Sequence, residues 1–265
     1  SITFDKLLRR NHSKLHWYKK ITFAPKPPNE IINDGTSTCL NKWEGWEANI
    51  IETPCHKSIK YFTTLLDYLS GGEIIQTHFL TSFLAHTIQK PSNKIGVVPI
   101  LTSDQGSGKG TLAEILGQMF KETHFLQVCR MDQIIGDFNS LSAHKKLVIF
   151  EETPSYSDTT KWSVLKSFTT DKNQTINRKG VDAYKSDDFA NALIFSNSHD
   201  PVQMDGPMQR RNQIMAAIKM KNHKKFFKQL HMFMENNKEI FIDSCFTYLY
   251  NYKYDVDELR YFKKT

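Results

Sequence analysis

The sequence lacks the features that mark membrane-spanning and secreted proteins. No apolar run approaches the ~20 residues that a membrane-spanning helix needs, so we expect no membrane partner. The first 20 residues, SITFDKLLRRNHSKLHWYKK, are basic and aromatic and contain no apolar signal-peptide core. The sequence also does not begin with methionine, as expected for a piece of a longer protein. These absences predict a protein that is not secreted.

Paired cysteines are absent as well. The four cysteines, Cys39, Cys55, Cys129 and Cys245, are scattered and form no CxxC pair. The favoured interpretation is buried thiols in a reducing compartment. A zinc site built from Cys39, Cys55 and His56 is the alternative, and adjacent ligands such as Cys55 and His56 give poor tetrahedral geometry.

What the sequence does contain is typical of a packed soluble protein. It has 265 residues, 39% of them hydrophobic and 24% charged, with frequent Phe and Tyr, and no internal repeat. That length allows one sizeable core with a small appended subdomain. The net charge of +7 is consistent with an anionic partner, of which nucleic acid is one kind.

The N-terminal part changes character near residue 58. Residues 1–57 show no clear period, and we expect Trp43 and Trp46 to be core residues, with base stacking as the alternative. Residues 58–72 and 73–90 then repeat apolar residues at helical spacing, and end at a Gly pair and before Pro91 respectively.

Short apolar runs follow at 95–101, 146–150 and 191–196, and helical patterns lie between them. Strands that alternate with helices predict an α/β fold with a central parallel sheet flanked by helices. Two further helical stripes begin at His223. We therefore expect an N-terminal subdomain (1–92, mainly helical from 58), an α/β core (93–221) and a C-terminal helical segment (222–265).

The stretch ILTSDQGSGKGTL, residues 100–112, predicts a phosphate-binding loop. It has an apolar strand, a turn of small residues, a lysine and a helix in the required order. In the pattern GxxxxGK[ST], however, Ser103 replaces the first glycine and Gly110 replaces the hydroxyl residue, so Thr111 supplies the first hydroxyl. Ser103 is tolerable if its φ is negative. We expect an ATP or GTP site, which the following residues bind: Gly106, Ser107, Gly108, Lys109, Gly110 and Thr111.

Polar residues end the next two strands. Glu151 and Glu152 follow KLVIF, where one acid can hold magnesium and the other can orient or deprotonate water. Asn197 directly follows NALIFS and can position that water. The alternatives are two solvated carboxylates and a turn-forming asparagine. Arg210 and Arg211 come shortly afterwards, and arginine suits a developing phosphate charge.

This order of motifs, together with LNKWEGW at 40–46, resembles the superfamily 3 helicases, which are AAA+ ATPases of viral and phage primase-helicase type. The similarity covers roughly residues 40–220. It implies that residues 93–221 form a P-loop ATPase core. Within it Gly106, Gly108, Lys109 and Thr111 match Walker A, Glu151 and Glu152 match Walker B, and Asn197 matches sensor 1. Arg211 matches the arginine finger best and Arg210 second. The resemblance implies ATP and Mg²⁺ as cofactors, and it leaves Thr111 and Glu151 as the candidate magnesium ligands.

The segment TINRKGVDAYK, 175–185, has a glycine turn between two β-compatible arms. In the resembling family this region carries a hairpin that grips one nucleic-acid strand. Phosphate contacts from Arg178, Lys179 and Lys185 and base stacking by Tyr184 are then expected. The alternative is an edge hairpin that carries lysines for solubility.

The resemblance implies an ATP-dependent replicative helicase module that moves along single-stranded or forked DNA as a homo-hexamer. It would act in the cytoplasm or at a viral replication site, and a primase domain upstream in the same polypeptide is a candidate partner. A non-translocating AAA+ switch or loader is the alternative. A nucleotide kinase, suggested by the ending GKGT, is less favoured because it leaves Asn197 and the hairpin without a role.

Overall fold

The computed structural model describes residues 20–25, 32–33, 38–129, 134, 139–151, 159–178, 180–197, 212–218, 220 and 222–262. Its centre is a five-stranded sheet in which every neighbouring pair is parallel. The strands are β4 (Val98–Thr102), β5 (Phe125–Val128), β6 (Leu147–Phe150), β9 (Asn191–Ser196) and β10 (Asn212–Ala216), in the order β10-β4-β9-β6-β5. The fold is therefore α/β, as the sequence predicts.

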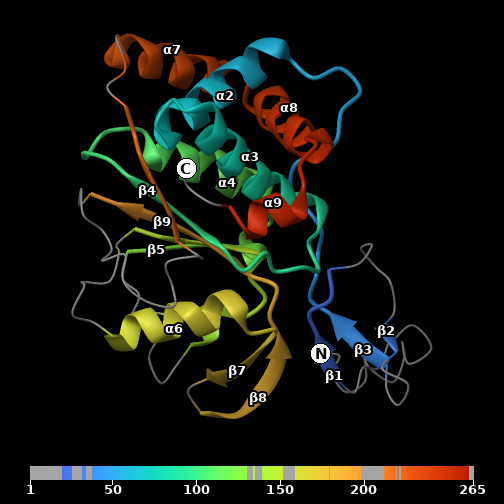
Figure 1. The fold of residues 1–265 in the computed structure, drawn as a ribbon. Coiled ribbons are helices and arrows are strands. Elements are labelled where there is room, and N and C mark those ends of the chain that lie inside the picture. The colour runs from blue at the N-terminus through green and yellow to red at the C-terminus, as the bar shows by residue number, and fades with distance from the viewer. Residues whose placement is uncertain are drawn as a thin grey trace.

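Helices cover both faces of this sheet (Figure 1). One face carries α2 (His56–Ser70), α3 (Ile74–Gln89), α4 (Lys109–Met119), α7 (His223–Asn236), α8 (Lys238–Asn251) and α9 (Val256–Arg260). The other face carries α6 (Thr159–Thr170). Helices from before and after the sheet thus share one core with it.

Side chains alternate between the two faces along the central strands. Leu147 and Ile149 of β6 join the large core under α2, α3, α4 and α8, whereas Val148 and Phe150 join the smaller core with Leu165 of α6. A strand that is buried on both faces has no polar positions, which explains its continuous apolar sequence. The predicted central strands are confirmed on this basis, although β4 begins at Val98 and not at 95, because Gly96 has a φ of 83°.

A small second sheet lies near the N-terminus. It contains β1 (Lys20–Thr22), β2 (Ile32–Asn33) and β3 (Thr38–Asn41), in the order β1-β3-β2. Trp43 after β3 is buried and stacks on His124, 4.7 Å between ring centroids, and Trp46 packs edge-on against Trp43. The prediction that these tryptophans are core residues is confirmed. His124 belongs to the short helix η2 (Glu122–His124), and its Nε2 accepts a hydrogen bond from the Glu44 amide.

The prediction that the cysteines are buried thiols holds for only some of them. Cys39 and Cys245 are buried, but Cys129 is exposed because it follows the edge strand β5 at the open end of the sheet. Among the residues that the structure describes, no group of three or more His, Cys, Asp or Glu side chains is placed to hold a metal ion. The described helices include none that is long and apolar enough to cross a membrane.

His86 of α3 makes folding stability depend on pH. It is buried, its Nδ1 lies 3.0 Å from the Tyr254 hydroxyl, and its Nε2 has no partner among the described residues. Burial, together with the charge of Lys146, lowers the pKa of His86 to about 4. Because the unfolded chain binds this proton near pH 6.5, stability is lost as the pH falls from 6.5 towards 4.

We expect His86→Gln to reduce the loss of unfolding free energy between pH 7 and pH 5 by about 1 kcal/mol. Urea denaturation at the two pH values measures this difference. An equal loss in the variant and the parent would show that His86 does not carry it.

Candidate nucleotide site at the carboxyl edge of the sheet

The phosphate-loop candidate connects β4 to α4. Gly106 and Gly108 have φ values of 81° and 98°, which side chains other than glycine rarely adopt. Lys109 begins α4, so the free amides at the N-terminus of the helix face the loop. Ser103 has no positive φ, so it meets the condition under which it can replace the first glycine, and its amide donates to the Ser196 carbonyl of β9 at 3.1 Å. The loop is therefore tied to the neighbouring strand.

Lys109 lies between this loop and Asn197. Its Nζ donates to the Ser103 carbonyl (2.8 Å), the Ser103 hydroxyl (2.6 Å) and Asn197 Oδ1 (2.9 Å). Burial lowers the pKa of Lys109, and the negative charge of Asp104 opposes that shift. A half-buried ammonium held by neutral oxygens is suited to an anion that replaces them.

The carboxyl ends of β4, β9 and β6 bring the predicted site residues together. These strands are parallel neighbours, so the loop after β4, Asn197 after β9 and Glu151 after β6 lie at one edge. Lys109, Glu151 and Asn197 line the same cavity of about 720 Å³. Glu151 accepts hydrogen bonds from Gln127 Nε2 at 2.6 Å and from the Cys129 thiol at 3.1 Å. Glu152, Arg210 and Arg211 lie outside the described residues.

Helix α7 forms a further wall that the sequence does not predict. His223, Lys224, Phe227 and His231 line the cavity together with the loop. A β-carbon on Gly108 would lie 2.3 Å from Phe227, so only glycine fits beneath that ring. His231 Nε2 lies 3.0 Å from the Thr111 hydroxyl, the group predicted to reach magnesium. Thr111 is buried, and its hydroxyl is already engaged in this arrangement.

Gly110, which replaces the hydroxyl residue of the phosphate-loop pattern, has room for a side chain. A β-carbon on Gly110 would meet nothing within 4 Å, and Gly110 has no positive φ. We expect Gly110→Ser to fold at least as well as the parent, with a gain of up to roughly 0.5 kcal/mol from helix propensity.

Gly110→Ser should also lower the Mg²⁺ concentration that gives half-maximal nucleotide hydrolysis, because it restores the hydroxyl that follows the lysine. A magnesium titration measures this, with Gly110→Ala as the control for helix propensity. Identical titrations for the serine and alanine variants would contradict the assignment.

The predicted hairpin is present. β7 (Asn173–Arg178) pairs antiparallel with β8 (Val181–Asp187), and Gly180 turns between them with a φ of 76°. Tyr184 is half-buried opposite Ile176, and Lys185 is exposed. The side chain of Arg178 and all of Lys179 lie outside the described part. Since β8 leads directly into β9, the hairpin base lies at the amino edge of the sheet, opposite the nucleotide site.

That amino edge carries a second cavity, of about 860 Å³, lined by residues from 92–97, 169–172, 188–189 and 260–262. It is larger than the cavity beside Lys109. Its described lining contains no glycine loop that leads into a helix, and its buried Lys94 is already paired with Asp188. The smaller cavity at the carboxyl edge is therefore the better candidate for a nucleotide site.

Comparison with known proteins finds a match to a family model and a match to a phage protein. Residues 101–211 match a family of unknown function, DUF5906. Over 157 residues the chain is 28% identical to the DNA primase-polymerase of Nitratiruptor phage NrS-1, covering 58% of this chain and 22% of that protein. The chain is related in sequence to a phage primase-polymerase. It spans about a fifth of that relative's length.

Solved structures show where the likeness lies. The apo structure of the NrS-1 C-terminal region superposes with a TM-score of 0.71 at 21% identity, over 91% of this chain and 57% of that one. A second apo structure of the same region gives 0.70 over 91% and 56%. The fold is thus shared with that C-terminal region. A JCV helicase structure reaches only 0.41 at 10% identity, too low to support an argument.

Proposed function

We propose that the chain is an ATP-hydrolysing module of a viral or phage DNA replication protein. The observation that carries this proposal is the convergence of Lys109, Asn197 and Glu151 on one cavity beside a glycine loop and a helix N-terminus. These are the groups that a nucleoside triphosphate and its magnesium ion require, namely amide and ammonium donors for phosphates and a carboxylate for the metal.

The residues present fit ATP and Mg²⁺. Bound ATP supplies the phosphoanhydride bond that water cleaves. Lys109 neutralises phosphate charge, and Glu151 supplies an oxygen ligand of the kind that Mg²⁺ prefers. Asn197, already bonded to Lys109, orients water at the γ-phosphate end, and Glu152 is proposed as the base that accepts the proton of that water. The Thr111 hydroxyl is a metal ligand only if it leaves His231.

Hydrolysis is proposed to drive movement along single-stranded or forked DNA in a homo-hexamer. The net charge of +7, the hairpin with exposed Lys185, and the sequence likeness to a phage DNA primase-polymerase support a DNA partner. That likeness also supports a primase domain in the same polypeptide. The second candidate is a non-translocating AAA+ switch or loader that uses the same site. A nucleotide kinase remains disfavoured, because it has no use for the Asn197–Lys109 contact or the hairpin.

ATP hydrolysis measured with and without single-stranded DNA, together with the mass in solution, tests the proposal. We expect hydrolysis that DNA stimulates in a ring-sized particle. DNA binding without stimulation or unwinding would favour the switch. Phosphate transfer to a nucleoside monophosphate by a monomer would establish the kinase and end the helicase proposal.

A further inference from the structure

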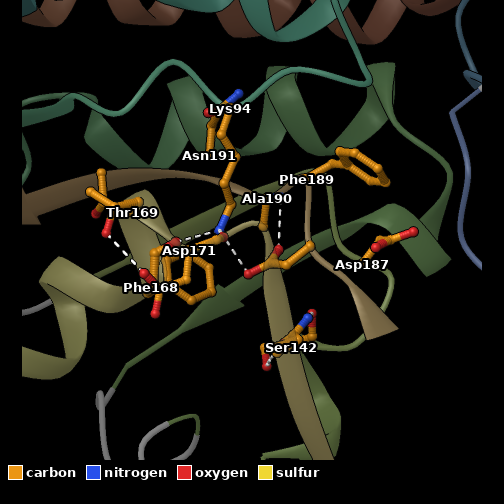
Figure 2. A network of polar contacts seen from close by, with 12 residues as sticks. Lys94, Ser142, Phe168, Thr169, Asp171, Asp187, Phe189, Ala190 and Asn191 are labelled. Carbon is orange, nitrogen blue, oxygen red and sulfur yellow. Dashed lines mark hydrogen bonds and ion pairs between the residues drawn. The ribbon is translucent and has the colours of Figure 1, made fainter. Parts of the chain in front are cut away.

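A buried cation lies at the base of the hairpin. Lys94, between α3 and β4, extends its Nζ to the Phe168 carbonyl (2.5 Å), the Asp171 carbonyl (2.9 Å) and Asp188 Oδ2 (2.7 Å). Figure 2 shows its side chain reaching down towards Phe168 and Asp171. The side chains of Lys94 and Asp188 are only 6% and 4% exposed. The ion pair is thus removed from water and has three defined contacts.

These contacts fix both ends of the hairpin. Phe168 lies in the last turn of α6, Asp171 directly follows that helix on the way to β7, and Asp188 immediately follows β8. The Asp188 amide donates to the Lys172 carbonyl at 2.8 Å, which closes the hairpin base. A cation beside the last carbonyls of a helix is also favoured by the helix dipole. Lys94 therefore joins the incoming and outgoing strands at one point.

The same point is attached to the strands of the nucleotide site. The amide of Ile95, next to Lys94, donates to Asn191 Oδ1 at the start of β9 at 3.2 Å, and Asn191 Nδ2 donates to Thr87 of α3. β4 and β9 carry the glycine loop and Asn197 at their other ends. Lys146 is fully buried, and its Nζ donates to the carbonyl of Phe189, the residue that follows Asp188.

Burying an ion pair costs free energy, because both charges lose their hydration. Burial lowers the pKa of Lys94 and raises the pKa of Asp188, and in each case the partner's charge opposes the shift. Apolar residues of similar volume would often stabilise the folded protein as well or better. We therefore ascribe to this pair a role in positioning the hairpin more than a role in stability. Here its contacts join both ends of the hairpin to the segment that precedes β4.

We infer that Lys94 and Asp188 form a clamp that positions the hairpin on the ATPase sheet, and so act as positioning residues for the nucleic acid that the hairpin holds. The inference rests on the proposed function for its DNA part. The mechanical part, a hairpin held by this pair, stands independently of DNA.

Amide hydrogen exchange tests the mechanical part. In Lys94→Met we expect exchange of residues 173–187 to accelerate at least tenfold, while β9 stays protected. The double variant Lys94→Met/Asp188→Asn, which leaves no buried unpaired charge, should behave in the same way. Lys90→Met, an exposed lysine four residues earlier, is the matched control. Unchanged exchange in the hairpin, or equal acceleration in β9, would overturn the clamp.

Nucleotide and DNA affinities then separate positioning from general stability. We expect the double variant to bind a labelled single-stranded oligonucleotide at least fivefold more weakly and to keep the parental Kd for ATP. Equal loss of both affinities would mean that the pair only stabilises the fold. Normal DNA binding with a loosened hairpin would contradict the positioning role. A parent that binds no DNA would refute the proposed function and leave the exchange result intact.

Discussion

Lys109→Ala should lower ATP hydrolysis by at least about 100-fold, because it removes the only described side-chain cation bonded to both the loop and Asn197. ATP binding should weaken as well, since the ammonium contacts phosphate oxygens in the bound state and not only in the transition state. Steady-state hydrolysis and equilibrium binding of ATP measure the two effects.

The control for Lys109→Ala is Lys121→Ala. Lys121 makes an exposed ion pair with Glu47 at 2.7 Å and is remote from the cavity, so its loss should leave hydrolysis unchanged. Urea denaturation of both variants confirms that the folded fraction is equal. Retained turnover in a folded Lys109→Ala protein would contradict the phosphate-loop assignment.

Arg211→Ala should abolish hydrolysis, with a loss of about 10³-fold, while ATP binding persists. Arg211 lies outside the described residues, so this expectation rests on the sequence alone, in which Arg211 matches the arginine finger best. We expect this arginine to serve the nucleotide of a neighbouring subunit.

Mixing experiments distinguish that arrangement from a finger that acts within its own chain. Arg211→Ala subunits mixed with Lys109→Ala subunits should regain hydrolysis, because some interfaces then combine an intact lysine with an intact arginine. Arg210→Ala is the matched variant and should lose less. If the mixture stays inactive although mixed rings form, the finger does not act in trans.

Strands of the sheet could be predicted where burial on both faces makes their sequence continuously apolar. β4, β6 and β9 lie inside the sheet and are apolar on both faces, so their runs stand out. The edge strands β5 and β10 were not predicted, because Gln127 and Asn212 interrupt their apolar pattern. The strands near the N-terminus are too short, at two to four residues, to show a period.

The candidate site was predictable to the extent that it is local. Lys109, Glu151 and Asn197 follow apolar strands directly, and parallel pairing brings such positions together. The wall from α7 was not predictable, because His231 meets Thr111 across 120 residues of chain. The apolar stripe that begins at His223 predicted a packed face of α7 but not the residues that this face contacts. Gln127 and Cys129, which hold Glu151, carry no signal of their own.

Amide hydrogen exchange with and without saturating ATP and Mg²⁺ tests whether a nucleotide binds in the cavity beside Lys109. We expect nucleotide to slow exchange in residues 103–112 and at the ends of β6 and β9, and Lys109→Ala to remove this protection. Protection confined to the cavity at the amino edge, around residues 92–97 and 260–262, would place the nucleotide there and refute the assignment of the site to Lys109.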